Sequence, residues 1–135
     1  MKEVTLYTDG SCRPNPGPGG WAYILQYNEA EKENYGGVQY STNNQMELQA
    51  VIEGLYALKA PCIVHLYSDS EYIVSGIKSW MYNWAKTGWK KNADQWKQVF
   101  NLCQIHDVRP TWVQAHNGNS MNERCDRLAK AATWR

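Results

Sequence analysis

The chain opens, after three residues, with Val4-Thr5-Leu6-Tyr7-Thr8-Asp9-Gly10-Ser11-Cys12. β-Branched, aromatic and apolar residues alternate along this run, which predicts a β-strand. Gly10 follows Asp9 directly, and we expect the strand to end there. An ionised carboxylate at the end of a buried strand is costly unless another group compensates it. Three more carboxylates stand in similar settings, so the set suggests a cation site.

Length and composition indicate one globular domain, over residues 1–135. Hydrophobic residues make up 43% of the chain, enough for a core, and no apolar run approaches the roughly 18 residues of a membrane span. The N-terminus lacks the basic-then-apolar pattern of a signal peptide. The four cysteines form no CxxC pair, which is typical of reduced thiols. We therefore expect a cytoplasmic protein, monomeric and with no membrane contact.

Charge is unevenly distributed although the net charge is only +1. Residues 78–97 contain five lysines and four of the seven tryptophans, with Asp94 as their single acid. Cations interleaved with flat rings are typical of surfaces that follow a nucleic-acid strand. A pair of helices with a solvated lysine face and an aromatic core explains the same composition. Both interpretations stay open at this point.

The first half of the chain predicts a meander followed by a crossover. Residues 13–20 indicate a loop, residues 21–27 and 33–40 antiparallel strands, and residues 28–32 a polar turn. Thr42 and Gln45 have the spacing of a capping box, and an apolar stripe at helical spacing follows. Residues 63–69 predict a strand ending in Asp69. A right-handed strand–helix–strand crossover makes this strand parallel to the first.

This topology places Asp9 and Asp69 at the carboxyl ends of parallel strands, where open α/β sheets bind ligands. Glu47 lies one step from the apolar stripe of its helix, at the edge of the buried face. Asp126 has the same relation to the apolar face of the last predicted helix. The four acids are therefore expected near one edge of the sheet.

The second half predicts helices more than strands. We expect short helices over residues 71–79 and 80–86, a break at Gly88, and a longer helix capped by Asn92. The apolar stripe of that helix consists of Trp96, Val99, Phe100 and Cys103. Residues 108–115 predict the last strand, and residues 116–120 a loop before the final helix.

Five ordered stretches resemble the type 1 ribonuclease H family. They are Tyr7-Thr8-Asp9-Gly10-Ser11 with the following Pro/Gly loop, residues 42–48, residues 68–70, residues 80–90, and His116-Asn117-Gly118 through residue 129. The resemblance implies an α/β, ribonuclease H-like fold: a five-stranded mixed sheet, antiparallel meander plus parallel strands, flanked by helices. It also implies an endonuclease that hydrolyses the RNA strand of RNA–DNA hybrids, leaving 5′-phosphate and 3′-hydroxyl ends.

By this resemblance Asp9, Glu47, Asp69 and Asp126 hold two Mg²⁺ ions, with Mn²⁺ as a substitute and Asp9 as the bridge. Clustered carboxylates repel one another, which raises their pKa values, and bound metal relieves that repulsion. Two divalent ions about 3.5–4 Å apart can stabilise phosphodiester hydrolysis, and Mg²⁺ prefers oxygen ligands. Each acid alone has a simpler role as a turn, cap or surface residue, so the hypothesis depends on the set.

His116 matches the family's mobile histidine. Its ordinary pKa near 6.5 suits proton transfer at neutral pH, so we expect it to assist the reaction and its loss to slow turnover. We expect His65, in mid-strand, and His106, late in a helix, to be structural.

The resemblance also implies substrate contacts. Small groups that sense the RNA 2′-hydroxyls are expected on the turn backbone of Gly10, Ser11 and Cys12 and at Asn15, Asn43 and Asn44. For the DNA strand we expect a phosphate pocket, an aromatic channel and a basic protrusion. Thr42 and Asn92 are expected to form the pocket, and Trp80 the channel. The protrusion is expected to contain Trp84, Lys86, Trp89 and Lys90.

Three departures from the family pattern predict weaker hybrid binding with the chemistry intact. Tyr40 stands where an arginine is frequent, Glu71 replaces a glutamine, and the basic protrusion is short. We expect a high Michaelis constant and a shallow salt dependence.

Three alternatives remain. A catalytically silent binding module would lack one of the four acids, and none is missing. A DNA-directed phosphotransferase of the wider superfamily would lack the asparagine cluster and the tryptophan-rich segment. A ribonuclease H domain excised from a reverse transcriptase is the third, although the initial methionine and full motif set favour a freestanding enzyme.

Overall fold

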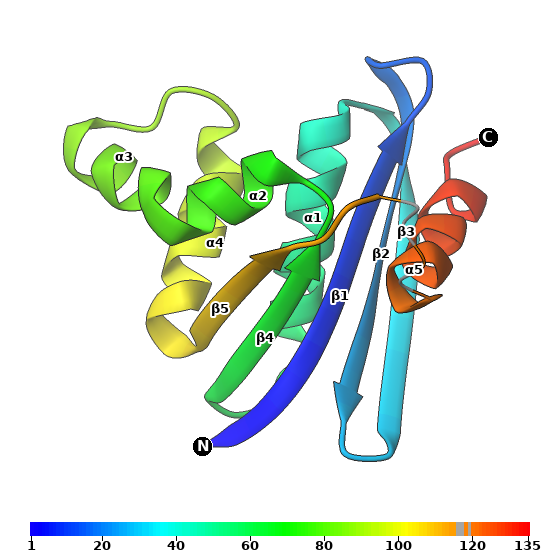
Figure 1. Ribbon diagram of the computed structural model, residues 1–135. Helices are drawn as coiled ribbons and strands as arrows, with labels where there is room; N and C mark the ends of the chain where they lie inside the picture. Colours follow the sequence, from blue (N-terminus) through cyan, green and yellow to red (C-terminus); the bar gives the residue numbers. More distant parts are fainter. Residues whose placement is uncertain (116–117, 119) are drawn as a thin grey trace.

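The computed structural model describes residues 1–115, 118 and 120–135. In this part of the chain, five strands form one sheet in the order β3-β2-β1-β4-β5 (Figure 1). The strands are β1 (Lys2–Cys12), β2 (Gly17–Tyr27), β3 (Ala30–Ser41), β4 (Cys62–Ser68) and β5 (Asp107–Trp112). The helices are α1 (Asn43–Tyr56), α2 (Glu71–Ser75), the π-helix η1 (Gly76–Trp80), α3 (Met81–Thr87), α4 (Ala93–Ile105) and α5 (Ser120–Ala131).

The sheet is mixed, as the sequence predicts. β1 pairs antiparallel with β2, and β2 with β3, which gives the meander. β1 pairs in parallel with β4, and β4 with β5. The carboxyl ends of β1 and β4 therefore meet at one edge.

Helices cover both faces of the sheet. Leu6 belongs to the larger core, with α1 and α4, whereas the next residue, Tyr7, packs with α5 and β2. Successive side chains of a strand point to opposite faces, so α1 and α5 lie on opposite sides of β1 (Figure 1). None of the described helices is long and apolar enough to cross a membrane.

The predicted end of the first strand at Gly10 is wrong, and the predicted loop over residues 13–20 is confirmed only for residues 13–16. β1 continues to Cys12, and β2 begins at Gly17, because residues 10–12 pair with residues 19–21. The glycines here serve close packing: a Cβ on Gly20 would lie 2.2 Å from the carbonyl oxygen of Ala129. A composition that indicates a loop therefore forms strand where a helix must approach.

Other boundaries also move. The turn is only Asn28-Glu29, so β3 is longer than residues 33–40, and β5 ends at Trp112 rather than residue 115. Instead of two short helices, residues 71–87 form α2, η1 and α3, and Ser120 already belongs to α5. Tertiary packing decides such boundaries, and local preference does not.

The predicted start of α1 is confirmed. Thr42 accepts a hydrogen bond from the backbone N of Gln45, at 3.2 Å. The Gln45 side chain accepts from Ser41 Oγ and donates to Asn92 Oδ1. The apolar stripe of α1 is buried, as are Trp96 and Val99 of α4, whereas Phe100 and Cys103 are only partly buried. All four cysteines are free thiols, as predicted.

Candidate active site

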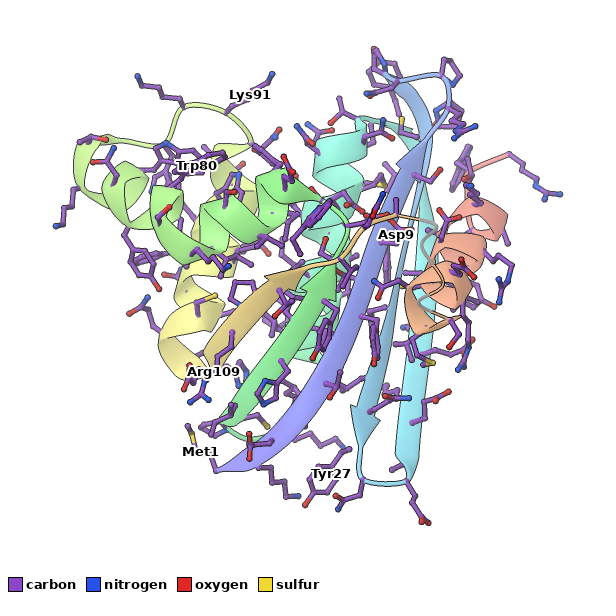
Figure 2. All side chains as sticks on the ribbon, in the orientation of Figure 1. Met1, Asp9, Tyr27, Trp80, Lys91 and Arg109 are labelled. Atoms are coloured by element: carbon purple, nitrogen blue, oxygen red, sulfur yellow. The ribbon has the colours of Figure 1, made fainter. Side chains whose placement is uncertain are left out.

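Four elements bring the predicted acids to one edge of the sheet. Asp9 is in β1, Glu47 in α1 and Asp126 in α5, and Asp69 directly follows β4. Asp9 and Asp69 come from neighbouring parallel strands whose register ends at Tyr7 and Tyr67. Figure 2 shows Asp9 near the end of β1, away from Met1 and Arg109 at the opposite end of the sheet.

Gly10 allows α1 to approach the sheet closely enough for Glu47 to reach this edge. A Cβ on Gly10 would lie 2.4 Å from the backbone N of Glu47 and 2.4 Å from the carbonyl carbon of Met46. Any side chain at this position would push the first turns of α1 away from β1. The glycine after Asp9 therefore sets the position of the second acid.

The acids converge around Asp9. One carboxylate oxygen from each of Asp9, Glu47 and Asp69 can be chosen so that all three lie within 4.8 Å of one another. Asp126 is within hydrogen-bonding reach of Asp9 and lines the same cavity, of about 280 Å³. Its Oδ2 also lies 3.0 Å from Nζ of Lys130. Three predicted ligands thus form a tight group, and the fourth lies beside it, partly neutralised by a lysine.

Burial and mutual repulsion disfavour negative charge in this cluster. Asp9 is 6% exposed and Glu47 is 7% exposed. Burial first, and then the charge of Asp69, raises the pKa of Asp9 to about 8. Burial, followed by the charge of Asp9, holds the pKa of Glu47 well above its ordinary range. Closely spaced oxygen donors with raised pKa values fit a hard divalent cation, which would take the place of the retained protons.

The predicted RNA contacts lie beside the acids, with one exception. Gly10, Ser11, Asn43 and Asn44 line the acidic cavity. Asn15 lines an adjoining pocket, and its Oδ1 accepts from the backbone N of Asn43 at 3.2 Å. The exception is Cys12, which lines neither pocket.

The Cys12 thiol organises the loop after β1 and does not reach the surface. Its Sγ lies 3.2–3.3 Å from the carbonyl oxygens of Pro14, Gly17 and Ser41. The Cys12 backbone pairs with Gly19 of β2. Its side chain therefore holds together the segments that carry Asn15 and Thr42.

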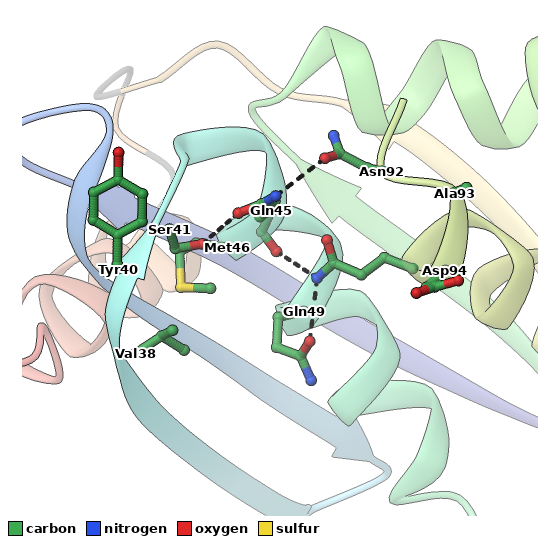
Figure 3. Close-up of a pocket in the computed structure, with 10 residues that line it drawn as sticks. Val38, Tyr40, Ser41, Gln45, Met46, Gln49, Asn92, Ala93 and Asp94 are labelled. Carbon is green, nitrogen blue, oxygen red and sulfur yellow. Dashed lines mark hydrogen bonds between the residues drawn. The ribbon is translucent and has the colours of Figure 1, made fainter. Parts of the chain in front are cut away.

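The predicted DNA-phosphate residues share a pocket of about 450 Å³. Thr42 and Asn92 line it, together with Lys91. Asn92 is the residue before α4, as predicted, but its side chain does not cap that helix. With φ 55°, Asn92 is left-handed, and its amide turns toward Gln45 of α1 (Figure 3). The same amide also contacts Tyr72 of α2.

The tryptophan-rich segment is partly core and partly surface. Trp84 packs against Trp96, Trp89 and Trp80, with ring centroids 5.3, 6.4 and 6.1 Å away. Trp80 is 46% exposed, and Lys86, Lys90 and Lys91 are exposed. In Figure 2, Trp80 and Lys91 lie in the helical region of residues 71–105, beside the sheet edge that carries Asp9. The packed rings confirm the aromatic core, whereas the exposed Trp80 and lysines leave the nucleic-acid surface a prediction.

His116 lies outside the described residues. Of the other histidines, His65 Nε2 lies 2.9 Å from Oε1 of Glu3, far along β1 from Asp9. His106 is buried, its Nδ1 accepts from the backbone N of Cys62 at 3.1 Å, and burial lowers its pKa. Both contacts agree with the structural roles expected of these two residues.

Sequence reasoning did not single out three residues of this site. Lys130 and Arg13 line the acidic cavity. The i, i+4 spacing of Asp126 and Lys130 could have indicated their ion pair. Tyr72, which contacts Asn92, has no local signal, because that contact joins α2 to the start of α4.

Comparison with known proteins fits this geometry. The family model for RNase H matches residues 1–133. A ribonuclease H of Campylobacter concisus (strain 13826) is 52% identical over 132 residues, covering 96% of this chain and 92% of that protein. The chain belongs to the ribonuclease H family. As a member, it is a metal-dependent endoribonuclease that acts on RNA–DNA hybrids.

Solved ribonuclease H structures share the fold. The crystal structure of LC9-RNase H1, a type 1 RNase H with the type 2 active-site motif, has a TM-score of 0.89 and 30% identity. That match covers 98% of this chain and 72% of the other. LC11-RNase H1, solved in complex with an RNA/DNA hybrid, has a TM-score of 0.77 at 22% identity, covering 96% and 95% of the two chains. The predicted ribonuclease H-like sheet is confirmed.

Proposed function

We propose that Asp9, Glu47, Asp69 and Asp126 hold two Mg²⁺ ions, and that the chain thereby cuts the RNA strand of hybrids to 5′-phosphate and 3′-hydroxyl ends. The observation that carries the proposal is the spacing of the acids: oxygens of Asp9, Glu47 and Asp69 lie within 4.8 Å of one another. Mn²⁺ offers the same charge and similar oxygen preferences, so we expect it to substitute.

The residues divide the work by their positions. Divalent cations, when bound, supply positive charge at the entering and leaving oxygens of the phosphodiester. Asp9 is central because Glu47, Asp69 and Asp126 all interact with it. Lys130 holds Asp126, which keeps the fourth carboxylate oriented beside the group. We assign His116, from its sequence motif alone, an assisting role in proton transfer.

Two adjoining pockets suggest how the two strands are distinguished. Asn43 and Asn44 line both the acidic cavity and the pocket that holds Thr42 and Asn92. A ribose 2′-hydroxyl beside the cut site would meet their amides, which recognises RNA. The DNA strand would pass Thr42 and Asn92 and continue over exposed Trp80 and the lysines of α3 and the loop after it. The further contacts that we propose are the backbone of Gly10, Ser11 and Cys12 and the side chains of Asn15, Trp84, Lys86, Trp89 and Lys90.

Two departures from the family pattern support the expectation that the DNA strand is bound weakly. Tyr40, 71% exposed, lines the pocket of Figure 3, as Asn92 does on the opposite side, and brings no charge. Glu71 is exposed at the start of α2, where its negative charge would repel a phosphate of the hybrid. We therefore expect a high Michaelis constant and a shallow dependence of binding on salt, with turnover intact.

We further propose that residues 1–135 act as one domain in a cytoplasmic monomer. Four free thiols support a reducing compartment. Residues of this one chain line the acidic cavity, so the site requires no second copy. Size-exclusion chromatography with light scattering tests the monomer, and cell fractionation tests the compartment.

One assay tests the function. Labelled RNA–DNA hybrid, RNA duplex and DNA duplex are incubated with Mg²⁺ or with EDTA, using the natural chain, Asp9→Asn and a matched Asp107→Asn control. Asp107 is exposed and pairs with Arg109 at the far end of the sheet. We expect cutting of hybrid RNA alone, lost with EDTA and with Asp9→Asn and retained with Asp107→Asn. Hybrid binding without cutting would favour the silent module, and DNA cutting would favour the phosphotransferase.

A further inference from the structure

A chain of hydrogen bonds fixes the side chain of Asn92 between two helices. Ser41 Oγ donates to Gln45 Oε1 at 3.0 Å, and Gln45 Nε2 donates to Asn92 Oδ1 at 3.3 Å. Asn92 Nδ2 then donates to the hydroxyl of Tyr72 at 3.1 Å. Figure 3 shows the Ser41–Gln45–Asn92 part of this chain beside its pocket.

The direction of these bonds decides which way the Asn92 amide faces. Gln45 presents its amino group to Asn92, and its carbonyl oxygen accepts from Ser41. Asn92 accordingly offers its oxygen to Gln45 and its amino group to Tyr72. A flip of the Asn92 amide alone would set two donors against each other at Gln45.

Tyr72 is itself held from the other side. Trp96 Nε1 donates to the Tyr72 hydroxyl at 2.7 Å, and the two rings meet edge to face with centroids 5.5 Å apart. Trp96 is fully buried, so it is a fixed anchor. The hydroxyl accepts from both Trp96 and Asn92, which joins the amide to the aromatic core.

One N–H of Asn92 remains after these contacts. Nδ2 carries two hydrogens, and Tyr72 takes one of them. Asn92 lines both the pocket that contains Thr42 and Lys91 and the pocket of Figure 3, whereas Tyr72 lines neither. The remaining N–H is the group that this side chain can offer to a strand lying there.

We propose that Tyr72 is a positioning residue for hybrid binding: its hydroxyl orients the Asn92 amide so that the free N–H faces the DNA strand. This inference rests on the proposed function, in which Asn92 contacts that strand. Tyr72 acts only through Asn92 and touches no substrate. Its hydroxyl should therefore affect the Michaelis constant and leave the chemical step unchanged.

The test is a double-mutant cycle on the full chain with labelled hybrid and Mg²⁺. Tyr72→Phe keeps the ring and removes the hydroxyl, and we expect KM to rise about 3- to 10-fold at constant kcat. In an Asn92→Ala background the same Tyr72→Phe change should leave KM as it is, because the group it orients is gone. Tyr56→Phe is the matched control, since Tyr56 is exposed at the other end of α1, and its KM should equal that of the natural chain.

The outcomes distinguish failure of the role of Tyr72 from failure of the proposed function. An equal KM effect of Tyr72→Phe in both backgrounds overturns the inference, because the hydroxyl then acts without Asn92. An unchanged KM for Tyr72→Phe or for Asn92→Ala, or a fall in kcat instead, also overturns it while the hybrid is still cut. Absence of hybrid cutting by the natural chain refutes the proposed function, and this inference falls with it.

Discussion

At the scale of single residues, Asp9 lies in an environment that disfavours its negative charge. It is almost fully buried, yet three other carboxylates surround it. In water an aspartate holds a proton only below about pH 4, whereas here its pKa rises to about 8. The arrangement that can bind cations therefore lowers the free energy of unfolding when no cation is bound.

Replacement of Asp9 should stabilise the metal-free protein while removing activity. Because the folded pKa of Asp9 is raised to about 8, the folded state retains a proton that the unfolded state loses above about pH 4. The associated stability is present at low pH and is lost as pH rises toward 8. At pH 7.5 in EDTA, Asp9→Asn should raise the free energy of unfolding by about 1–3 kcal/mol, measured by urea denaturation. Cleavage should fall by about 100-fold or more.

A second measurement, at pH 4.5, distinguishes stabilisation that is due to the raised pKa of Asp9 from stabilisation that is independent of pH. At pH 4.5 the gain from Asp9→Asn should shrink, because Asp9 of the unfolded chain then begins to hold a proton too, so that folding requires less proton uptake. The same gain at both pH values would contradict the assigned cause. Asp107→Asn should show no gain at pH 7.5, since Asp107 has a favourable partner in Arg109.

His106 gives a pH dependence of the opposite sign. Burial lowers its pKa, and neutral Nδ1 accepts the Cys62 amide. A depressed folded pKa contributes stability above the unfolded value of about 6.5, and that stability is lost as pH falls through the folded pKa. In His106→Asn an amide oxygen can replace Nδ1, so the stability advantage of the natural chain over this variant should shrink between pH 7 and pH 5. Urea denaturation at both pH values measures this, and a constant difference would refute it.

At the scale of elements, the distance between α1 and β1 decides whether the acids can meet. Gly10 sits where the helix crosses the strand, and two backbone atoms of α1 lie 2.4 Å from the position of a Cβ there. Backbone cannot move aside as a flexible side chain can. The position of α1, and with it that of Glu47, therefore requires a residue without a side chain at position 10.

Gly10→Ala should damage both stability and activity. Overpacking against backbone should reduce the free energy of unfolding by about 2 kcal/mol or more, and displacement of Glu47 should lower kcat. Gly54→Ala is the matched control, because its Cβ would meet side-chain atoms of Leu6 in the core, 2.7 Å away. That control should lose stability but keep the activity of its folded fraction. Full kcat in Gly10→Ala would show that the approach of α1 does not position Glu47.

At the scale of the whole molecule, the acids come from β1, α1, the end of β4 and α5, so only the complete fold assembles them. Of these elements, α1 and α5 lie on opposite faces of the sheet, with a separate packing cluster on each. A ligand that bridges the acids therefore stabilises the fold as a unit.

Mg²⁺ should raise the global stability at neutral pH. An ion concentration 100 times the dissociation constant adds about 2.7 kcal/mol for one site. Thermal unfolding with increasing Mg²⁺ should show a rising Tm at pH 7.5 and a smaller rise at pH 4.5, where protons compete for the carboxylates. Asp9→Asn should abolish most of this shift. An equal shift in Asp9→Asn would place the stabilising ion elsewhere.

Much of the fold follows from local patterns. The alternation in residues 4–9, the Thr42 cap and the apolar stripe of α1 are properties of short segments, and each predicted element is present. Asp9 and Asp69 were expected together because strand direction is constrained by the handedness of a crossover. For such features, the energy that selects the structure comes from neighbours in the chain.

Other features depended on segments far apart in sequence. Gly17 and Gly20 resemble loop residues until a helix from the other end of the chain packs on Gly20, and Asn92 resembles a cap until Tyr72 and Gln45 orient it. The sequence by itself determined which residues carry charge and which segments form most of the strands and helices, although several of their boundaries moved. Tertiary structure alone decided the spacing of the acids and the direction of the Asn92 amide, because both arise from close packing and hydrogen bonds between distant elements, which no local preference encodes.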